Sequence, residues 1–111
     1  MNPSIELKNL KHVYFLGIGG IGMSAIARWF LKNGVKVAGY DKTESPLTKT
    51  LASEGMEIHY EDDVRLIPSE ILEDREHSLF IFTPAIPKDH LEKNFLLDQG
   101  INLYKRSQIL G

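Results

Sequence analysis

A glycine-rich turn directly after a buried strand constrains the fold of this chain more than any other feature. The turn reads GIGGIGMS over residues 17–24, and residues 12–16 before it have the β-branched and aromatic content of a strand. Gly17, Gly19 and Gly22 fit the pattern G-x-G-x-x-G. In that pattern the first glycine permits a tight turn, the second admits a phosphate group close to the main chain, and the third lets helix and strand pack closely. We therefore expect a strand, a phosphate-binding turn and a helix in succession.

The residues after the turn predict an amphipathic helix. Its apolar positions recur with helical spacing on one face: Met23, Ile26, Ala27, Phe30 and Leu31. The first N–H groups of a helix have no internal partners, and the helix dipole adds roughly half a positive charge there. An anion can therefore bind at the turn without a lysine or an arginine. Gly20 removes one more side chain from the path of that anion.

An acidic residue stands where nucleotide-binding folds bind a ribose. The second apolar run, residues 35–40, ends at Asp41, 19 residues after Gly22. In such folds a carboxylate at the end of the second strand, about 20 residues beyond the glycines, accepts a hydrogen bond from a ribose hydroxyl. These features favour a nucleotide diphosphate site over a glycine turn with a purely structural role.

Strand and helix signals alternate along the whole chain, which predicts an α/β fold. The expected strands are residues 12–16, 35–40, 56–60, 79–83 and 101–104. Five helices are expected: one after the glycine turn, two after the N-caps Ser45 and Ser69, and two that begin after Lys88 and after Lys105. Three of these helices end before a glycine, at Gly34, Gly55 and Gly100. The simplest arrangement is one Rossmann-like domain over residues 1–111. It has a doubly wound, five-stranded, mainly parallel sheet in the order 3-2-1-4-5 and helices on both faces.

That sheet would bring distant segments to one crevice. Ligands of doubly wound sheets bind beyond the carboxyl ends of the strands, at the point where the strand order reverses. The glycine turn then lies next to residues 83–87, with Asp41 to one side. Thr83 offers a hydroxyl there, and Pro84 and Pro87 make the wall rigid; the alternative is a proline-shaped turn with a locally satisfied threonine. Arg106 is either a further anion contact or an ordinary surface charge.

The other polar residues predict no chemistry. Residues 61–63, Glu-Asp-Asp near His59, resemble a metal site, but consecutive side chains cannot all converge on one ion, so we expect a solvated loop. His12, His77 and His90 have no catalytic spacing and are expected at the surface or at strand ends. We expect no catalytic residue and no metal ligand in this chain.

Composition excludes several function classes. The net charge of −2 gives no reason to expect a nucleic-acid partner, and the absence of cysteine excludes disulfides and thiolate metal sites. No apolar run is long enough to span a membrane and the first residues do not resemble a signal peptide, so we expect a cytoplasmic protein. No lysine follows a glycine, so the ATP-binding motif G-x-x-x-x-G-K-[ST] is absent. The chain is typical of a binding module.

With these residues placed, residues 12–110 resemble the N-terminal domain of the Mur ligases, ATP-dependent amide-forming enzymes of bacterial cell-wall synthesis. The doubled glycine followed by Gly22-Met23 carries most of the resemblance. Three further segments fall in the expected order: residues 39–41, 83–86 and 105–107. Where relatives have a Gly-His pair after the third strand, this chain has acidic residues around Glu61 and Asp62.

The resemblance implies that this domain binds the UDP part of UDP-N-acetylmuramate, with the diphosphate on the glycine turn. ATPase and C-terminal domains would follow in the full-length enzyme, where ATP and Mg²⁺ activate the muramyl carboxylate for attack by the amine of L-alanine. This segment itself would need no cofactor and would not be catalytic. The substrate-binding residues would be Gly17, Ile18, Gly19, Gly20, Ile21, Gly22, Met23, Ser24, Tyr40, Asp41, Thr83, Pro84, Ala85, Ile86 and Arg106.

Three other functions remain open. The glycine turn with Asp41 also suits the NAD-binding domain of an oxidoreductase, and the carboxylate would favour NAD over NADP because it repels a 2′-phosphate. A ligase that recycles murein peptides shares the same architecture, although residues 18–22 favour the enzyme that adds alanine. A regulatory domain that senses nucleotides is the third.

Overall fold

The computed structural model describes residues 9–110. Within them, five strands form one sheet in the order β3-β2-β1-β4-β5. The strands are β1 (His12–Leu16), β2 (Lys36–Tyr40), β3 (Glu57–His59), β4 (Ser78–Phe82) and β5 (Leu103–Tyr104). Every neighbouring pair is parallel, which confirms the predicted fold class and strand order.

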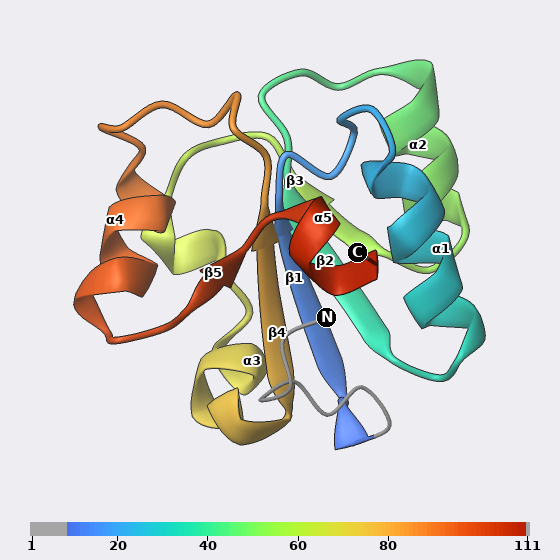
Figure 1. Ribbon diagram of the computed structural model, residues 1–111. Helices are drawn as coiled ribbons and strands as arrows, with labels where there is room; N and C mark the ends of the chain where they lie inside the picture. The colour runs from blue at the N-terminus through green and yellow to red at the C-terminus, as the bar shows by residue number, and fades with distance from the viewer. Residues whose placement is uncertain (1–8, 111) are drawn as a thin grey trace.

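Helices connect the strands and cover both faces of the sheet (Figure 1). They are α1 (Met23–Lys32), α2 (Pro46–Ser53), α3 (Ser69–Glu73), α4 (Leu91–Asp98) and α5 (Arg106–Leu110), with short 3₁₀ turns η2 (Val64–Leu66) and η3 (Arg75–His77). Figure 1 shows α1 and α2 on one side of the sheet and α3 and α4 on the other. None of the helices within residues 9–110 is both long and apolar enough to cross a bilayer.

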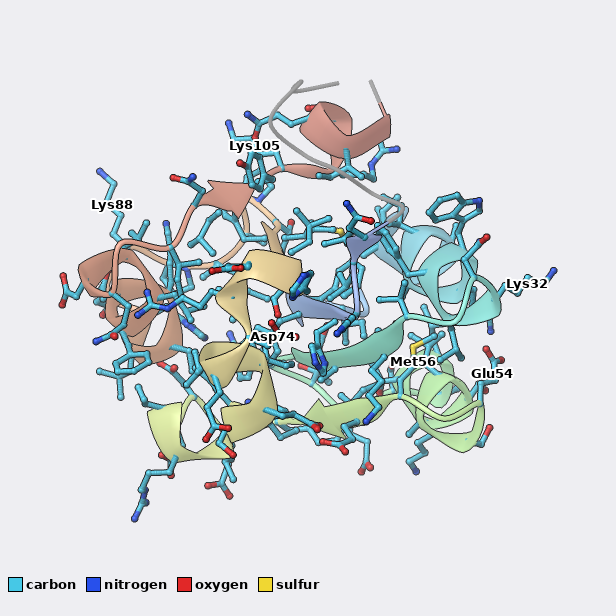
Figure 2. All side chains as sticks on the ribbon, turned by 90° about the horizontal axis from the view of Figure 1, so that it is seen from below. Lys32, Glu54, Met56, Asp74, Lys88 and Lys105 are labelled. Carbon is cyan, nitrogen blue, oxygen red and sulfur yellow. The ribbon has the colours of Figure 1, made fainter. Side chains whose placement is uncertain are left out.

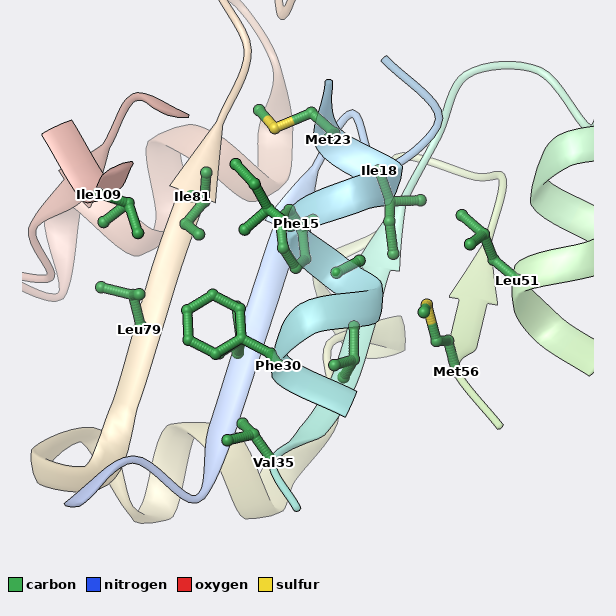
Figure 3. Close-up of a cluster of buried hydrophobic side chains, with 14 residues drawn as sticks. Phe15, Ile18, Met23, Phe30, Val35, Leu51, Met56, Leu79, Ile81 and Ile109 are labelled. Atoms are coloured by element: carbon green, nitrogen blue, oxygen red, sulfur yellow. The ribbon is translucent and has the colours of Figure 1, made fainter. Parts of the chain in front are cut away.

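The central strand β1 contributes alternate side chains to two separate cores. Val13 and Phe15 pack with residues of α1, α2 and α5, the cluster drawn in Figure 3. Tyr14 and Leu16 point to the other face, where they pack with residues of α3 and α4. Because both faces are covered, β1 is buried along its whole length, as its unbroken apolar sequence predicts.

Local capping signals were right at one helix and wrong at another. Ser45 caps α2 in a reciprocal capping box, since the N–H of Thr48 donates to Ser45 Oγ at 3.1 Å and the N–H of Ser45 donates to Thr48 Oγ1 at 2.9 Å. Ser69, predicted as a cap, is already the first residue of α3; Pro68 occupies the N-cap and makes no side-chain hydrogen bond.

Several expected elements are shorter in the structure, among them the fourth helix and the fifth strand. The fourth helix begins at Leu91, two residues later than expected, because its N-terminal N–H groups are capped by Asp62 from another loop. β5 pairs with β4 only over Leu103 and Tyr104. Charged residues gather at the periphery, where Lys32 of α1 points away from the sheet (Figure 2).

Candidate functional site

The glycine loop between β1 and α1 is held in shape by its own backbone. The N–H groups of Gly17 and Ile18 both donate to the carbonyl oxygen of Tyr40, at 2.7 and 3.0 Å, and that of Gly20 donates to the carbonyl of Gly17 at 2.9 Å. Ile21 and Gly22 come next, and their N–H groups have no backbone acceptor within residues 9–110. These two amides at the start of α1 are the loop donors best placed to meet an anion.

Gly17 and Gly22 of the loop have backbone conformations that favour glycine. Gly17 has φ 95° and Gly22, the N-cap of α1, has φ 80°, in the left-handed region that other residues rarely adopt. A methyl group on Gly17 would collide with the methyl group of Thr83. One on Gly22 would lie 3.1 Å from Cδ of Arg106. The absence of side chains thus lets the loop touch the segment after β4 and the first residue of α5.

Asp41 is bound to the glycine loop. Its Oδ2 accepts a hydrogen bond from the N–H of Gly19 at 2.7 Å, and its Oδ1 accepts one from the N–H of Thr43 at 3.1 Å. Asp41 follows β2, on the opposite side of β1 from the loop after β4, so it lies to one side as expected and is also hydrogen-bonded to the glycine loop. Each oxygen keeps a second lone pair, so the carboxylate can still accept a hydrogen bond from a ribose hydroxyl.

A crevice of about 810 Å³ opens where these segments meet, at the carboxyl ends of the strands. Its volume lies within the range of small-molecule sites. Nine of the predicted residues line it: Gly17, Gly19, Gly20, Ile21, Tyr40, Asp41, Thr83, Ala85 and Ile86. The sheet order therefore brings the glycine loop, the end of β2 and the loop after β4 together as expected.

The other predicted residues lie outside the crevice wall. Ile18 and Met23 are buried in the core on the α1 face, and Ser24 lies in the first turn of α1. Pro84 is exposed in the loop after β4. Arg106 is exposed and lies beside Gly22 at the N-terminus of α1, so it approaches the loop from the α5 side.

Thr83 takes part in the turn after β4. Its carbonyl accepts a hydrogen bond from the N–H of Ile86 at 3.1 Å, and its own N–H donates to the carbonyl of Leu16. Its hydroxyl is reached only weakly by the N–H of Ala85, at 3.5 Å. The turn is locally satisfied, as the structural alternative predicted, yet the hydroxyl has capacity left for a further partner.

Tyr40 belongs to the wall as a packed side chain. Its ring meets the ring of His90 edge to face, with centroids 4.7 Å apart, and only 7% of the residue is exposed. Burial, and then the negative charges of Asp62 and Glu92, raise the pKa of the Tyr40 hydroxyl. This hydroxyl therefore stays protonated near neutral pH.

Sequence reasoning missed three residues of the crevice, Lys42, Asp62 and His90, whereas Pro87 lines it as expected. Asp62 belongs to the segment expected to be a solvated loop, but it caps α4, accepting hydrogen bonds from the N–H groups of Leu91 at 2.7 Å and Glu92 at 2.9 Å. His90 was expected at the surface and is 4% exposed, as the N-cap of α4. Each is positioned by a residue about 30 positions away, so local spacing gave no signal.

A buried polar network supports this wall from behind. Glu92 is completely buried; Tyr14 donates its hydroxyl proton to Oε1, and Oε2 lies 2.7 Å from His59 Nε2 and accepts the N–H of Asp63 at 3.2 Å. Burial and the neighbouring Glu92 raise the pKa of Tyr14 far above its usual range. The network joins β1, β3, the loop after β3 and α4.

His59 and Asp63, like Asp62, are thus structural partners rather than solvated groups. Asp63 also caps η2, because its Oδ1 accepts the N–H of Arg65 at 2.9 Å. Among the described residues, no three His, Asp or Glu side chains are grouped so that they could hold a metal ion.

Comparisons with known proteins identify the family of this chain. The family model described as "Mur ligase family, catalytic domain" matches residues 12–111. The UDP-N-acetylmuramate–L-alanine ligase of Cytophaga hutchinsonii is 54% identical over 107 residues, which are 96% of this chain and 23% of that protein. The chain thus spans less than a quarter of the length of this relative.

Two solved structures share the fold. The UDP-N-acetylmuramate-alanine ligase of Thermotoga maritima matches with a TM-score of 0.69 and 29% identity, covering 89% of this chain and 21% of that one. The UDP-N-acetylmuramate:L-alanyl-gamma-D-glutamyl-meso-diaminopimelate ligase of Neisseria meningitides matches with a TM-score of 0.73 over 91% of this chain and 30% of that one. At 20% identity the second likeness concerns the fold alone. The family match over residues 12–111, together with the strand order and the glycine loop, shows that the chain belongs to the Mur ligase family.

Proposed function

We propose that this chain binds the UDP part of UDP-N-acetylmuramate, as the N-terminal domain of a ligase that joins L-alanine to the muramyl carboxylate. The observation that carries the proposal is the meeting of the glycine loop, Asp41 and the loop after β4 in one crevice. The 54% identity to a protein named for this reaction supports the choice of substrate.

In this proposal each segment of the crevice has one task. The N–H group of Ile21, in the crevice wall, and that of Gly22, just beyond it, hold the diphosphate, with Arg106 close enough to add a positive charge. Asp41, fixed by Gly19, accepts a hydrogen bond from the ribose. The turn at Thr83 forms the wall of the crevice toward the N-acetylmuramyl sugar. The chain therefore binds and orients a substrate.

The chemical step belongs to other parts of a longer protein. The acyl transfer needs ATP and Mg²⁺, and this chain has no P-loop lysine to hold a triphosphate. We place the ATPase and C-terminal domains in the part of the relatives' length that this chain does not span.

Titration followed by amide NMR tests the binding proposal. We expect UDP-N-acetylmuramate and UDP to shift the resonances of residues 19–24 and of Thr83, while NAD leaves them unchanged. Binding of NAD alone would instead favour the oxidoreductase alternative and overturn the proposal.

The choice of amino acid is tested in the whole protein. We expect ADP release with UDP-N-acetylmuramate and L-alanine, and none when L-alanine is replaced by the peptide L-alanyl-γ-D-glutamyl-meso-diaminopimelate. Turnover of the peptide alone would identify the murein-peptide ligase, the activity named for the Neisseria meningitides structure.

A further inference from the structure

A second cavity lies beside η2 and α4, in addition to the crevice at the strand ends. It is an open groove of about 600 Å³, and Asp62 is the only described residue that lines both it and the crevice. The glycine loop, Asp41 and Thr83 do not line it. Figure 1 shows α4 on the other side of the sheet from α1 and α2. The groove is therefore separate from the proposed diphosphate and ribose contacts.

One face of α4 forms a side of this groove. Four residues of the helix line it: Leu91, Asn94, Phe95 and Asp98. They recur at intervals of three and four positions, so they share one face of the helix. Val64, from η2, adds to the apolar lining. Val64 and Phe95 also pack against the core, whereas Leu91 is 60% exposed. The groove thus has an apolar floor that is anchored in the fold.

Exposed apolar side chains gather on these two elements. Five large apolar side chains are exposed within residues 9–109, and three of them belong to η2 and α4. They are Leu66, Leu91 and Leu97, of which 42%, 60% and 48% are exposed. Single exposed leucines are ordinary, whereas apolar groups collected on one surface mark a site of interaction. Contact with a partner would remove this apolar surface from water.

The polar residues that line the groove are mostly acidic. They include four carboxylates and one guanidinium, that of Arg65. Arg65 is already bound, because its Nε and Nη2 donate to Asp63 at 3.1 and 2.8 Å. Glu61 and Asp98 are exposed, and their side chains make no hydrogen bond or ion pair within the described part of the chain. Two negative charges beside the apolar floor are therefore left for a partner.

We propose that the groove between η2 and α4 docks a basic amphipathic segment of a partner protein. The apolar side chains of that segment lie against Val64, Leu91 and Phe95. Its lysines or arginines pair with Glu61 and Asp98 at the edge of the contact. Nucleic acids and anionic lipid surfaces carry the same sign of charge as the groove, so neither suits it. The docking surface is independent of the proposed nucleotide site.

A pair of synthetic helical peptides tests the docking surface. One peptide has leucine on one face and lysine on the other, and the second has glutamate in place of every lysine. In amide NMR titrations of the 111-residue chain, the lysine peptide should shift the resonances of Val64, Leu91 and Phe95. The glutamate peptide should bind at least about tenfold more weakly. Equal affinity for the two peptides, or shifts confined to other surfaces, overturns the proposal.

Charge reversal tests which residues attract the basic segment. The double variant Glu61→Lys, Asp98→Lys should bind the lysine peptide about tenfold more weakly than the wild type. Glu44→Lys, Glu76→Lys is the matched control, because it changes two exposed acids outside the groove and alters the net charge equally. The control should keep the wild-type affinity. Equal losses in the two double variants would show that net charge alone attracts the peptide, and would overturn the proposal.

Two further measurements separate docking from other causes. Leu91→Ser should weaken the lysine peptide, whereas Trp29→Ser, at an exposed position of α1, should not; thermal melts verify that both are folded. UDP affinity should be unchanged in the Glu61→Lys, Asp98→Lys variant, since neither residue lines the crevice. Loss of UDP binding with the peptide affinity kept contradicts the proposal. Sedimentation of the chain alone tests for a second copy in the groove: a dimer that dissociates in this double variant also overturns it.

Discussion

The two walls of the crevice are built in opposite ways. The glycine loop is shaped by backbone hydrogen bonds and by missing side chains, which let the chain approach Thr83 and Arg106 closely. The wall at α4 is shaped by side chains, with Glu92 buried completely and Asp62 capping the helix. The first wall depends on a glycine pattern that is visible within residues 17–24, and the second depends on side chains that meet only in the folded chain. The two should therefore fail differently when they are mutated.

Replacing Glu92 by leucine should have the largest effect on stability. The change leaves the Tyr14 hydroxyl, the N–H of Asp63 and His59 without their buried partner. Loss of one member of such a buried charged network costs about 3–5 kcal/mol. Urea unfolding measures the free energy, with the exposed Glu73→Leu as control, expected to change it by less than about 0.5 kcal/mol. Similar small losses in both variants would show that the network contributes little.

Replacing Gly17 by alanine should damage the other wall. Gly17 has φ 95° and its new methyl group would collide with Thr83, whereas Gly34 has φ 82° and open space around it. We expect Gly34→Ala to lose about 1 kcal/mol from backbone strain alone and Gly17→Ala to lose about 1–3 kcal/mol more from overpacking. UDP affinity should fall only for Gly17→Ala. Equal unfolding curves for the two variants would refute a tight contact at Thr83.

The pH dependence of the stability of Tyr14→Phe distinguishes the contribution of the Tyr14 hydrogen bond from that of packing of its ring. Because the pKa of Tyr14 is raised in the folded state, the stability linked to it is complete below the unfolded value of about 10 and is lost as the pH rises above it. The variant should lose about 1.5–3 kcal/mol at neutral pH, the usual contribution of a hydrogen bond to a charged group. Above about pH 10 its stability should fall less steeply than that of the wild type, by about 1.4 kcal/mol per pH unit. Parallel pH profiles would contradict this role for Tyr14.

Gly20→Val should weaken binding with the smallest effect on folding. Its Cβ would lie 3.1 Å from the carbonyl oxygen of Gly17, and the rest of the side chain would enter the crevice. We expect UDP affinity to fall about tenfold, equivalent to about 1.4 kcal/mol. Lys32→Ala, on the outer face of α1, should leave the affinity unchanged (Figure 2). Equal loss in both variants would argue against a site at the glycine loop.

The sequence predicted the fold and the glycine wall because their signals are local. The apolar run of β1, the glycine pattern, the stripe of α1 and the cap at Ser45 each lie within a few residues of the structure they specify. Parallel strands with right-handed crossovers leave few orders open, so β3-β2-β1-β4-β5 could be inferred. These parts needed no knowledge of distant contacts.

The α4 wall could not be predicted because its contacts join residues that are far apart in the sequence. Asp62 and Glu92 are 30 residues apart, and a carboxylate that caps a distant helix has the same local sequence as one in a solvated loop. His90 was expected at the surface or at a strand end because it has no catalytic spacing to another residue. The burial of Glu92 and His90 can be recognised only when the position of α4 against the sheet is known.

The hydrogen bond between Asp41 and Gly19 gives one carboxylate two duties. It restrains the loop, and if the loop binds a ligand in this shape, that restraint lowers the entropy cost of association. It is also the group proposed to recognise the sugar. A substitution at Asp41 would therefore change both the shape of the loop and the proposed recognition of the sugar. Sugar recognition could change on its own only if another residue first took over the hydrogen bond to Gly19.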